Sequence, residues 1–427
     1  MILNYGRLSA AAASVGMLLA SAVAERAAHA AWDFVPDLDL RAQEQDNPRY
    51  VPDNSPPPFQ KESTSSAILD MSVEMATYTE RGSLVFDPEI INYQYTDNAY
   101  SDLESTDYYF TGSGQYKWRT AVAGFVARFT REHLAAAEFG SVDFNLDQPN
   151  PDTGDTGRVT TFIDQHRNFY WLSPYVLFNL SDRNALRFDF ANYDISYTEG
   201  DLAARTGYKD RLFTTTLQRN VDERTQVAAV ASIEQYNADV NTNDFRTVTL
   251  KGTFERPLNQ LWTFNMAAGV LRSDYSVVDL LNRVTTSATT DYIVDLQFRK
   301  RSERSNLNFD LTRDVYPSSN GYNVVRREAR LALQRQFKPR LTMDLGFRLQ
   351  ETKTLGNLNA ANDRNYAIVT GEWDWAMKPK LYLVGSFEWL SQKYPNDILN
   401  RGEMDATSLT IGIRYRGLSK RNPPTTR

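Results

Sequence analysis

The sequence predicts an all-β protein, a transmembrane antiparallel up-and-down β-barrel of about 18 strands, with about 16 as the alternative number. Three observations predict this fold. Apolar and polar side chains alternate over successive stretches of about ten residues. Short and long connections alternate between these stretches. The chain is also rich in aromatic residues, with 23 Tyr, 22 Phe and 7 Trp, and every Trp lies near the end of a stretch.

Composition excludes several other classes of protein. The mean hydropathy is -0.50, and no apolar run long enough for a membrane-spanning helix follows the N-terminal segment. The chain has no cysteine, which excludes disulfides, thiolate metal sites and thiol catalysis. Its formal net charge of -6 argues against a nucleic-acid partner.

The alternation is clearest in the C-terminal half of the chain. Leu345, Phe347 and Leu349 alternate with polar residues, and so do Ile411 and Ile413. One face of each such strand is therefore apolar and the other polar. In chain order, the same pattern predicts strands near residues 32–42, 67–79, 83–95, 107–118, 121–133, 167–180, 185–198, 209–219, 226–237, 245–255, 261–273, 290–300, 306–315, 323–336, 341–351, 365–376, 381–393 and 406–416.

The connections between these strands fall into two kinds that alternate along the chain. Short turns are expected at 80–82, 119–120, 181–184, 220–225, 257–260, 302–305, 338–340 and 378–380, and longer loops near 44–65, 96–106, 134–165, 199–207, 238–244, 274–288, 316–322, 353–363 and 395–404. Outer-membrane barrels have this arrangement, with an even number of strands and both chain ends in the periplasm. A soluble two-sheet sandwich is the alternative, but its connections would not alternate so regularly and its core would not accept so many charges.

The N-terminus has the pattern of a secretory signal peptide. Arg7 precedes an apolar run from Leu8 to Ala24, and small residues mark a cleavage site near Ala30, with a cut after Ala24 as the alternative. We therefore expect a signal peptide over 1–30, a barrel over 31–416 and a periplasmic C-terminal tail over 417–427. The expected location is the outer membrane of a Gram-negative bacterium.

The polar faces of the predicted strands carry many charged residues. An arginine or lysine that faces lipid at the bilayer midplane costs about 2–4 kcal/mol, so these side chains are expected to face a water-filled interior. Both signs occur, so the sequence indicates no clear preference for anions or cations. The candidate pore-lining residues are Lys117, Arg128, Asp295, Arg299, Asp310, Asp314, Arg326, Glu328, Arg330, Asp344, Arg348, Glu388 and Arg414.

The tryptophans are expected to form the aromatic girdles of a membrane barrel, where amphipathic rings lie at the two lipid–water interfaces. The periplasmic girdle would contain Trp32, Trp118, Trp262, Trp373 and Trp375. Trp171 and Trp389 would lie at the external interface.

Antiparallel pairing across the loop at 316–322 predicts one ladder of inner charges. If the apolar faces stay together, Asp314 lies opposite Arg326 and Asp310 lies opposite Arg330. Arg348 on the following strand would lie beside Arg330. This sector of the interior is expected to be net basic.

Chemistry at a discrete site has little support in the sequence. His133 and His166 are the residues to test for catalysis, because they fall at the external ends of neighbouring strands on either side of the longest loop. No partner pattern accompanies them, and the segment Asp143–Asp155 lacks the ligand spacing of a calcium loop. We therefore expect no enzymatic activity, no catalytic residue, no metal site and no cofactor.

Charges also differ between the two predicted rims. The short turns are basic, for example at Arg183, Arg224 and Lys380, whereas the long loops are acidic, for example at Asp143 and Asp147. Such a gradient would attract an anionic polymer to the periplasmic mouth and repel it at the other side. The alternative is that the acidic loops bind divalent ions or only keep the rim soluble.

The segments WDFVPDLDLRAQEQDNPRY, YTERGSLVFDPEIINYQYTD and DLESTDYYF resemble a known family. This is the outer-membrane β-barrel porin type 2 family of Gram-negative bacteria, whose members are associated with exopolysaccharide production and export. The resemblance extends in layout from Trp32 onward and implies no catalytic residue. The chain departs from the family at its end, because the terminal aromatic Tyr415 is followed by the tail 417–427.

We therefore expect an outer-membrane, porin-like channel for hydrophilic solute, with exopolysaccharide export as the specific role that the resemblance implies. The expected partners are outer-membrane lipid and lipopolysaccharide, the barrel assembly machinery, and a polysaccharide substrate or its export apparatus. Two alternatives are a structural or adhesion barrel that conducts nothing and an outer-membrane hydrolase at the rim.

Overall fold

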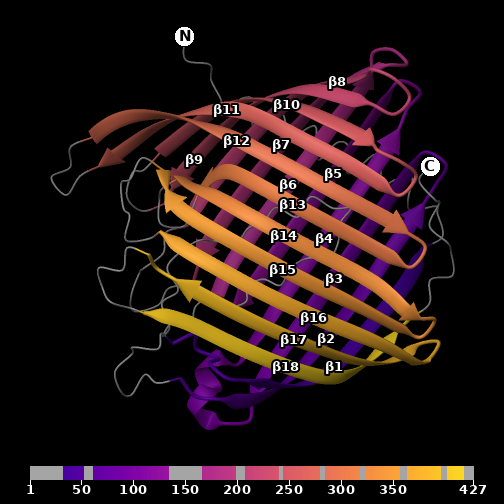
Figure 1. The fold of residues 1–427 in the computed structure, drawn as a ribbon, viewed down its shortest axis with the longest axis vertical. Coiled ribbons are helices and arrows are strands. Elements are labelled where there is room, and N and C mark those ends of the chain that lie inside the picture. Colours follow the sequence, from indigo (N-terminus) through magenta and orange to yellow (C-terminus); the bar gives the residue numbers. More distant parts are fainter. Residues whose placement is uncertain are drawn as a thin grey trace.

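Eighteen antiparallel strands form one closed barrel (Figure 1). Each strand pairs with its neighbours in the chain, and β18 closes the sheet by pairing with β1. The predicted fold class and its favoured number of strands are confirmed. The structure is a computed structural model that describes residues 32–51, 61–133, 166–198, 207–239, 244–278, 284–317, 323–355, 363–395 and 402–417.

Every predicted strand is present, with ends that differ from the prediction by a few residues in most cases. The strands are β1 Asp33–Gln45, β2 Thr64–Tyr78, β3 Gly82–Tyr95, β4 Ser105–Lys117, β5 Ala121–His133, β6 His166–Asn179, β7 Asn184–Tyr197, β8 Tyr208–Asn220, β9 Gln226–Ala238, β10 Asp244–Pro257, β11 Trp262–Val278, β12 Val284–Ser302, β13 Ser305–Pro317, β14 Asn323–Lys338, β15 Leu341–Thr354, β16 Arg364–Lys378, β17 Leu381–Lys393 and β18 Glu403–Arg416. A short 3-10 helix, η1 (Asn98–Leu103), follows β3. No helix in the described part of the chain is long and apolar enough to cross a bilayer.

The predicted short turns lie together at one rim of the barrel, on the right in Figure 1. In the turn between β2 and β3, the backbone N–H of Thr79 donates to the carbonyl oxygen of Gly82 at 2.8 Å. In the turn between β8 and β9, the Asp222 carboxylate accepts the backbone N–H groups of Arg224 and Thr225, both at 2.7 Å. Aspartate favours such turns because its side chain binds nearby backbone N–H groups. We call this end the turn rim and the opposite end the loop rim.

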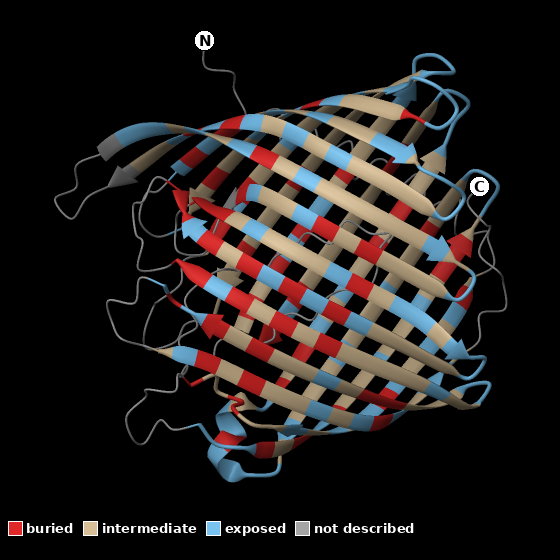
Figure 2. Cartoon of the chain, in the orientation of Figure 1, coloured by how far each residue is buried: buried red, intermediate tan, exposed pale blue. Residues whose placement is uncertain are grey.

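Side chains alternate between an apolar outer face and a polar inner face. On β1, Leu38 and Leu40 are 44% and 59% exposed, whereas Asp39 between them is 1% exposed. The alternation arises because successive side chains of a strand point to opposite sides of the sheet. Figure 2 shows buried and exposed residues interspersed along the strands, and the buried apolar residues form separate clusters in the wall. The large apolar surface is therefore on the outside, as in a barrel that stands in lipid.

The hairpin of β11 and β12 is longer than the sequence predicts. The sequence predicts a loop over 274–288, but β11 continues to Val278 and β12 begins at Val284. Within this extension Ser276 lies opposite Thr286. Its residues are rich in Ser and Thr and lack the apolar alternation, because a strand beyond the bilayer needs no lipid-facing side. In Figure 1 the hairpin protrudes from the loop rim.

Three predictions concern residues outside the described ranges. They are the signal peptide over 1–30, the tail beyond Gly417, and the acidic segment within the loop at 134–165. These stay predictions.

Candidate functional site

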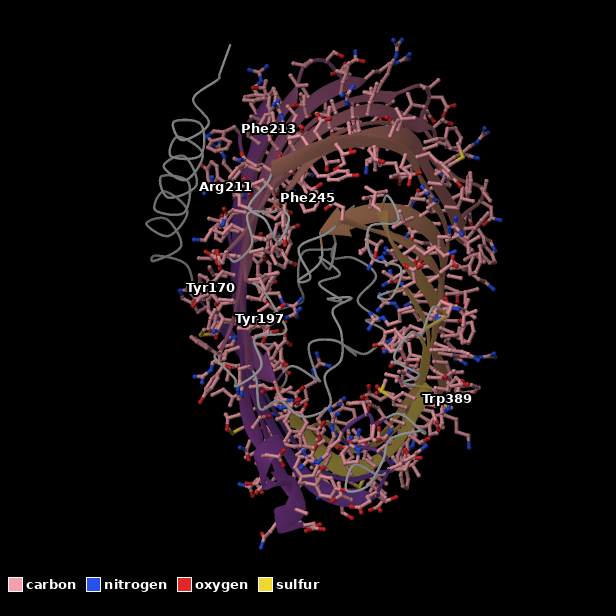
Figure 3. The ribbon with its side chains drawn as sticks, turned by 90° about the vertical axis from the view of Figure 1, so that its left-hand side faces the viewer. Tyr170, Tyr197, Arg211, Phe213, Phe245 and Trp389 are labelled. Carbon is pink, nitrogen blue, oxygen red and sulfur yellow. The ribbon has the colours of Figure 1, made fainter. Side chains whose placement is uncertain are left out.

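The inner face of the barrel is the candidate functional site. Residues directly opposite each other on neighbouring strands share a face, so the pairing assigns strand residues to the inside or the outside. Figure 3, seen from the loop rim, shows Tyr197 and Phe245 inside the wall and Tyr170 and Trp389 outside it. Tyr236 lies directly opposite Phe245 and is therefore also an inner residue.

The pairing places the candidate pore-lining residues on the inner face. Asp310, for example, lies opposite Gln297 on one side and Arg330 on the other. The candidates come from eight strands: Lys117 on β4, Arg128 on β5, Asp295 and Arg299 on β12, Asp310 and Asp314 on β13, Arg326, Glu328 and Arg330 on β14, Asp344 and Arg348 on β15, Glu388 on β17 and Arg414 on β18. The inner face thus carries charges of both signs.

The predicted charge ladder between β13 and β14 is present. Asp310 lies opposite Arg330, and Asp314 lies opposite Arg326. The Arg330 guanidinium donates to Asp310, with Nη2 and Oδ2 3.2 Å apart. Arg348 lies opposite Arg330 on the other side, as expected. The register of this hairpin therefore follows from its inside–outside pattern.

The expectation that this sector is net basic is wrong. Arg348 forms an ion pair with Glu328, with Nη2 and Oε2 2.7 Å apart and the side chains 10% and 7% exposed. Glu328 lies opposite Gln350, so it reaches Arg348 diagonally across the sheet. Each of the three arginines thus has a carboxylate directly opposite it or paired with it. The sector is therefore balanced in charge.

A second group of inner charges is absent from the sequence prediction. It consists of carboxylates on the first three strands, which we call the acidic strip: Asp37, Asp39, Asp70, Asp87 and Glu89. Arg41 contacts this strip, with its Nη2 2.5 Å from Asp39 Oδ2. The sequence feature that could have predicted the strip is the local alternation of Asp37 and Asp39 with Leu38 and Leu40.

Arg414 connects carboxylates from separate strands. Its Nη1 lies 3.1 Å from Asp374 Oδ2, and its Nη2 lies 3.0 Å from Glu372 Oε1. Both acids are on β16, two strands away, and a third partner, Asp39, is on β1. The planar guanidinium can serve several oxygens at once because its donors are fixed in a fork. These inner charges therefore brace the wall as well as line it.

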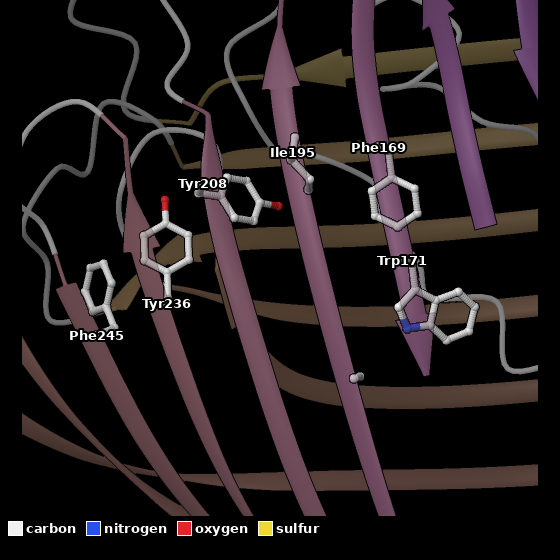
Figure 4. Packing of buried hydrophobic residues seen from close by; sticks show 7 residues of the cluster. Phe169, Trp171, Ile195, Tyr208, Tyr236 and Phe245 are labelled. Atoms are coloured by element: carbon white, nitrogen blue, oxygen red, sulfur yellow. The ribbon is translucent and has the colours of Figure 1, made fainter. Parts of the chain in front are cut away.

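The assignment of Trp171 to the external girdle is wrong. Trp171 lies opposite Arg128 and Tyr193, which places it on the inner face. It is 9% exposed and stacks on Tyr193, with ring centroids 6.1 Å apart. Its neighbours form a buried cluster near the loop rim that includes Phe169, Tyr208, Tyr236 and Phe245 (Figure 4). The physical reason is burial, since the indole packs among other rings instead of facing lipid.

The other tryptophans lie on the outer face. Trp118 and Trp375 are 46% and 49% exposed near the turn rim. Trp32 stacks on the outer residue Phe86, and Trp262 lies 5.6 Å from the Lys300 ammonium. Trp373 and Trp389 occupy outward positions of β16 and β17. Rings with a polar edge are suited to the interface between lipid and water.

His133 and His166 lie opposite each other near the loop rim, with ring centroids 5.8 Å apart. Glu132 does not join them, because it faces inward and forms an ion pair with Arg167 at 2.5 Å. Asp164, the other acid near these histidines, lies outside the described residues. Within the described ranges, no group of three or more His, Asp or Glu side chains is placed to hold a metal ion.

No family model matches the sequence, and a search of curated proteins finds no similar sequence. Solved barrel structures match most of the chain at low identity. OccK2 (OpdF) of Pseudomonas aeruginosa, solved in complex with glucuronate, is 12% identical with a TM-score of 0.45, and the match covers 90% of this chain and 98% of that chain. The BenF-like porin of Pseudomonas fluorescens Pf-5 is 9% identical with a TM-score of 0.46, covering 91% and 98%. The outer membrane protein OpdK of Pseudomonas aeruginosa is 10% identical with a TM-score of 0.44, covering 90% and 99%.

Proposed function

We propose that the chain forms an outer-membrane channel that passes hydrophilic solutes. The observation that carries the proposal is a closed wall of 18 strands with an apolar outer face and a charged inner face. A closed barrel can stand in lipid because its backbone groups pair within the sheet and leave no open edge. A barrel of this size encloses more space than its own side chains fill.

The inner charges support a water-filled interior. Ion pairs such as Arg330 with Asp310 hold these side chains against the wall, and Arg330 remains 29% exposed. Charged groups at this depth would be costly without water or a partner. A wall lined in this way favours hydrophilic solutes over apolar ones.

The two rims support one orientation in the membrane. Outer-membrane barrels place short turns in the periplasm and long loops outside the cell. The turn rim, with Trp118 and Trp375 near it, would accordingly face the periplasm. In this position lipid and lipopolysaccharide surround the outer face, and the barrel assembly machinery is the partner during insertion.

The finer form of the proposal is outward passage of an exopolysaccharide, the role implied by the family resemblance. Basic residues of the turn rim, such as Arg183, Arg224 and Lys380, support the approach of an anionic polymer from the periplasm. The export apparatus that delivers such a polymer would then dock at this rim.

Single-channel recording of the purified full chain in a planar bilayer tests the coarser proposal. We expect stepwise currents that scale with salt concentration. A chain that migrates as a folded barrel before heating, but conducts nothing, would favour the structural or adhesion alternative.

Two further measurements address the finer proposal and the remaining alternative. Liposomes that contain the barrel should release charged oligosaccharides if a polymer can pass, and release of small ions alone would contradict polysaccharide export. A hydrolytic activity that His133→Ala and His166→Ala abolish would point instead to an enzyme at the rim.

A further inference from the structure

A groove lies on the outer face of the barrel, across β12 to β18 and near the loop rim. Its volume is about 840 Å³. It is an outside feature, because the lining residues Tyr292, Leu311 and Leu349 are 52%, 37% and 45% exposed. Its floor is apolar except for Ser391, and most residues of its border are charged. We call it the outer groove.

The register of the strands explains the two parts of the outer groove. The border is a row of directly opposed residues, in order Val294, Arg313, Arg327, Glu351, Asn365, Lys393 and Glu403. The next outward row toward the turn rim forms the floor, with Leu296, Leu311, Ala329, Leu349, Ala367 and Ser391. Two residues along a strand span about 7 Å, so the outer face changes from charged to apolar over that distance.

The hollow coincides with small side chains in the floor. Ala329 and Ala367 lie on either side of Leu349, so two small side chains stand at the centre of the floor. The row after the floor is apolar throughout its first six positions, which are Phe298, Phe309, Leu331, Phe347, Val369 and Trp389. The floor is therefore continuous with the lipid-facing band. An acyl chain is a flexible apolar ligand that would fill such a hollow.

The border carries a surplus of positive charge above this floor. Glu351 is shared between two cations, with Oε2 2.9 Å from Arg327 Nη1 and Oε1 2.7 Å from Lys353 Nζ. One carboxylate cannot neutralise both cations. Arg327 and Lys353 are 52% and 47% exposed, so a further anion can reach them from outside.

Arg313 extends the basic border to the neighbouring strand. Its guanidinium carbon lies 3.8 Å from the ring centroid of Tyr292, and its Nη2 lies 2.8 Å from Asp291. These contacts hold the guanidinium over the edge of the apolar floor. A positioned guanidinium is a good donor to phosphate oxygens, because its paired N–H groups match their geometry.

We propose that the outer groove binds a lipopolysaccharide molecule, with a headgroup phosphate at Arg327 and Lys353 and an acyl chain over Ala329 and Ala367. The inference rests on the proposed function, which places the loop rim at the outer leaflet of the outer membrane. The surplus positive charge selects an anionic headgroup, and the adjoining hollow selects a ligand whose acyl chain begins about 7 Å farther from the loop rim than its phosphate.

Titration of the purified full chain with lipid A in detergent, followed by native mass spectrometry, tests this inference. Lipid A with its phosphates should bind, and dephosphorylated lipid A should bind about tenfold or more weakly. The double variant Arg327→Gln with Lys353→Gln should show the same loss. Ala329→Phe should weaken binding by filling the hollow, and Ala367→Phe does the same if the first variant fails to fold.

Arg272→Gln is the matched control. Arg272 is also an arginine on the outer face near the loop rim, 66% exposed and 3.1 Å from Asp274, but it lies on β11, outside the groove. This variant should bind lipid A as the parent chain does. Migration before and after heating shows that each variant has folded, so lost binding cannot be a loss of the barrel.

Equal binding by the parent chain, the double variant and the groove-filling variant would overturn the inference. Equal binding of phosphatidylglycerol would overturn the assignment to lipopolysaccharide. Conductance of the same preparations separates the two proposals. A parent chain that conducts but binds no lipid A contradicts only the groove, and one that binds lipid A but does not conduct contradicts only the channel.

Discussion

The guanidinium of Arg414 donates through Nε to Oδ2 of Asp39, 2.9 Å away, across the seam where the last strand meets the first. The two residues lie directly opposite each other in the register of β1 and β18. Arg41 contacts the same oxygen at 2.5 Å, and Asp39 is 1% exposed. One buried carboxylate therefore holds two guanidinium groups where the barrel closes.

Asp39→Asn is expected to lower the free energy of unfolding by about 3 kcal/mol, because it removes the buried carboxylate that Arg41 and Arg414 share and leaves Arg414 with only its β16 partners. Urea titration in lipid vesicles, with folding followed by mobility before heating, measures the change. Arg416→Gln is the control, since its ion pair with Asp37 is longer, at 3.7 Å, and Arg416 is 62% exposed. The control should lose no more than about 1 kcal/mol. Equal losses would show that the seam pair contributes no more than an exposed one.

Neighbouring residues on β15 provide a test of the two faces. Leu345 is 44% exposed on the outer face, so Leu345→Arg should destabilise the inserted barrel by about 2–4 kcal/mol. Asp344 lies opposite the inner residue Glu372, and Asp344→Arg would place a cation near that acid. We expect little loss of insertion for this second variant. Folding yields in vesicles compare the two, and similar yields would mean that the faces have been assigned wrongly.

The Arg330–Asp310 pair should influence ion selectivity in both directions. Arg330→Gln leaves the carboxylate without its partner and should shift the channel toward cations, whereas Asp310→Asn should shift it toward anions. Reversal potentials in a salt gradient measure both shifts. Neutral substitutions are used because Arg330→Glu with Arg348→Glu would set carboxylates against Asp310 and Glu328. Shifts of the same sign, or none, would show that this pair does not face the permeating ions.

The turn between β8 and β9 should make a small, pH-dependent contribution to stability. The backbone N–H of Arg224 donates to Asp222 and, with Thr225, holds the pKa of that carboxyl below its usual value. A lowered pKa means that the stabilisation is complete above the unfolded-state pKa and is lost as the pH falls through the folded-state pKa. Asp222→Asn should therefore unfold more easily than the parent at neutral pH, and the difference should disappear once the pH has fallen below the folded-state pKa of Asp222. A difference between their unfolding midpoints that stays constant with pH would contradict this origin.

Much of the wall could be predicted because its signals are local. On β14, Arg326, Glu328 and Arg330 alternate with Arg327, Ala329 and Leu331, and this period of two identifies a strand with a charged face. Turn residues such as Asp222 mark where a strand ends, because they bind backbone groups close to them in the chain. The pairing of Asp310 with Arg330 could also be predicted from the sequence, since a slip of one residue would bring charges into lipid.

Trp171 shows where the local pattern is insufficient. It stands between Tyr170 and Leu172, so both alternating sets are apolar and either could face lipid. Only its pairing with Arg128 and Tyr193 places the indole inside. The contact of Arg348 with Glu328 was missed for a similar reason, since it depends on which diagonal neighbours two paired strands bring within reach.

The sequence by itself determined the order of the strands, their favoured number and the two faces of most of them, because alternation and turn chemistry operate over a few residues. Only the tertiary structure decided the seam and the outer groove. Asp39 and Arg414 are 375 positions apart, and closure of the sheet alone makes them neighbours. The row from Val294 to Glu403 likewise depends on the register of six successive strand pairs. A shift of two residues in any pair would keep every side chain on its face and still break the row, so a period of two cannot encode it.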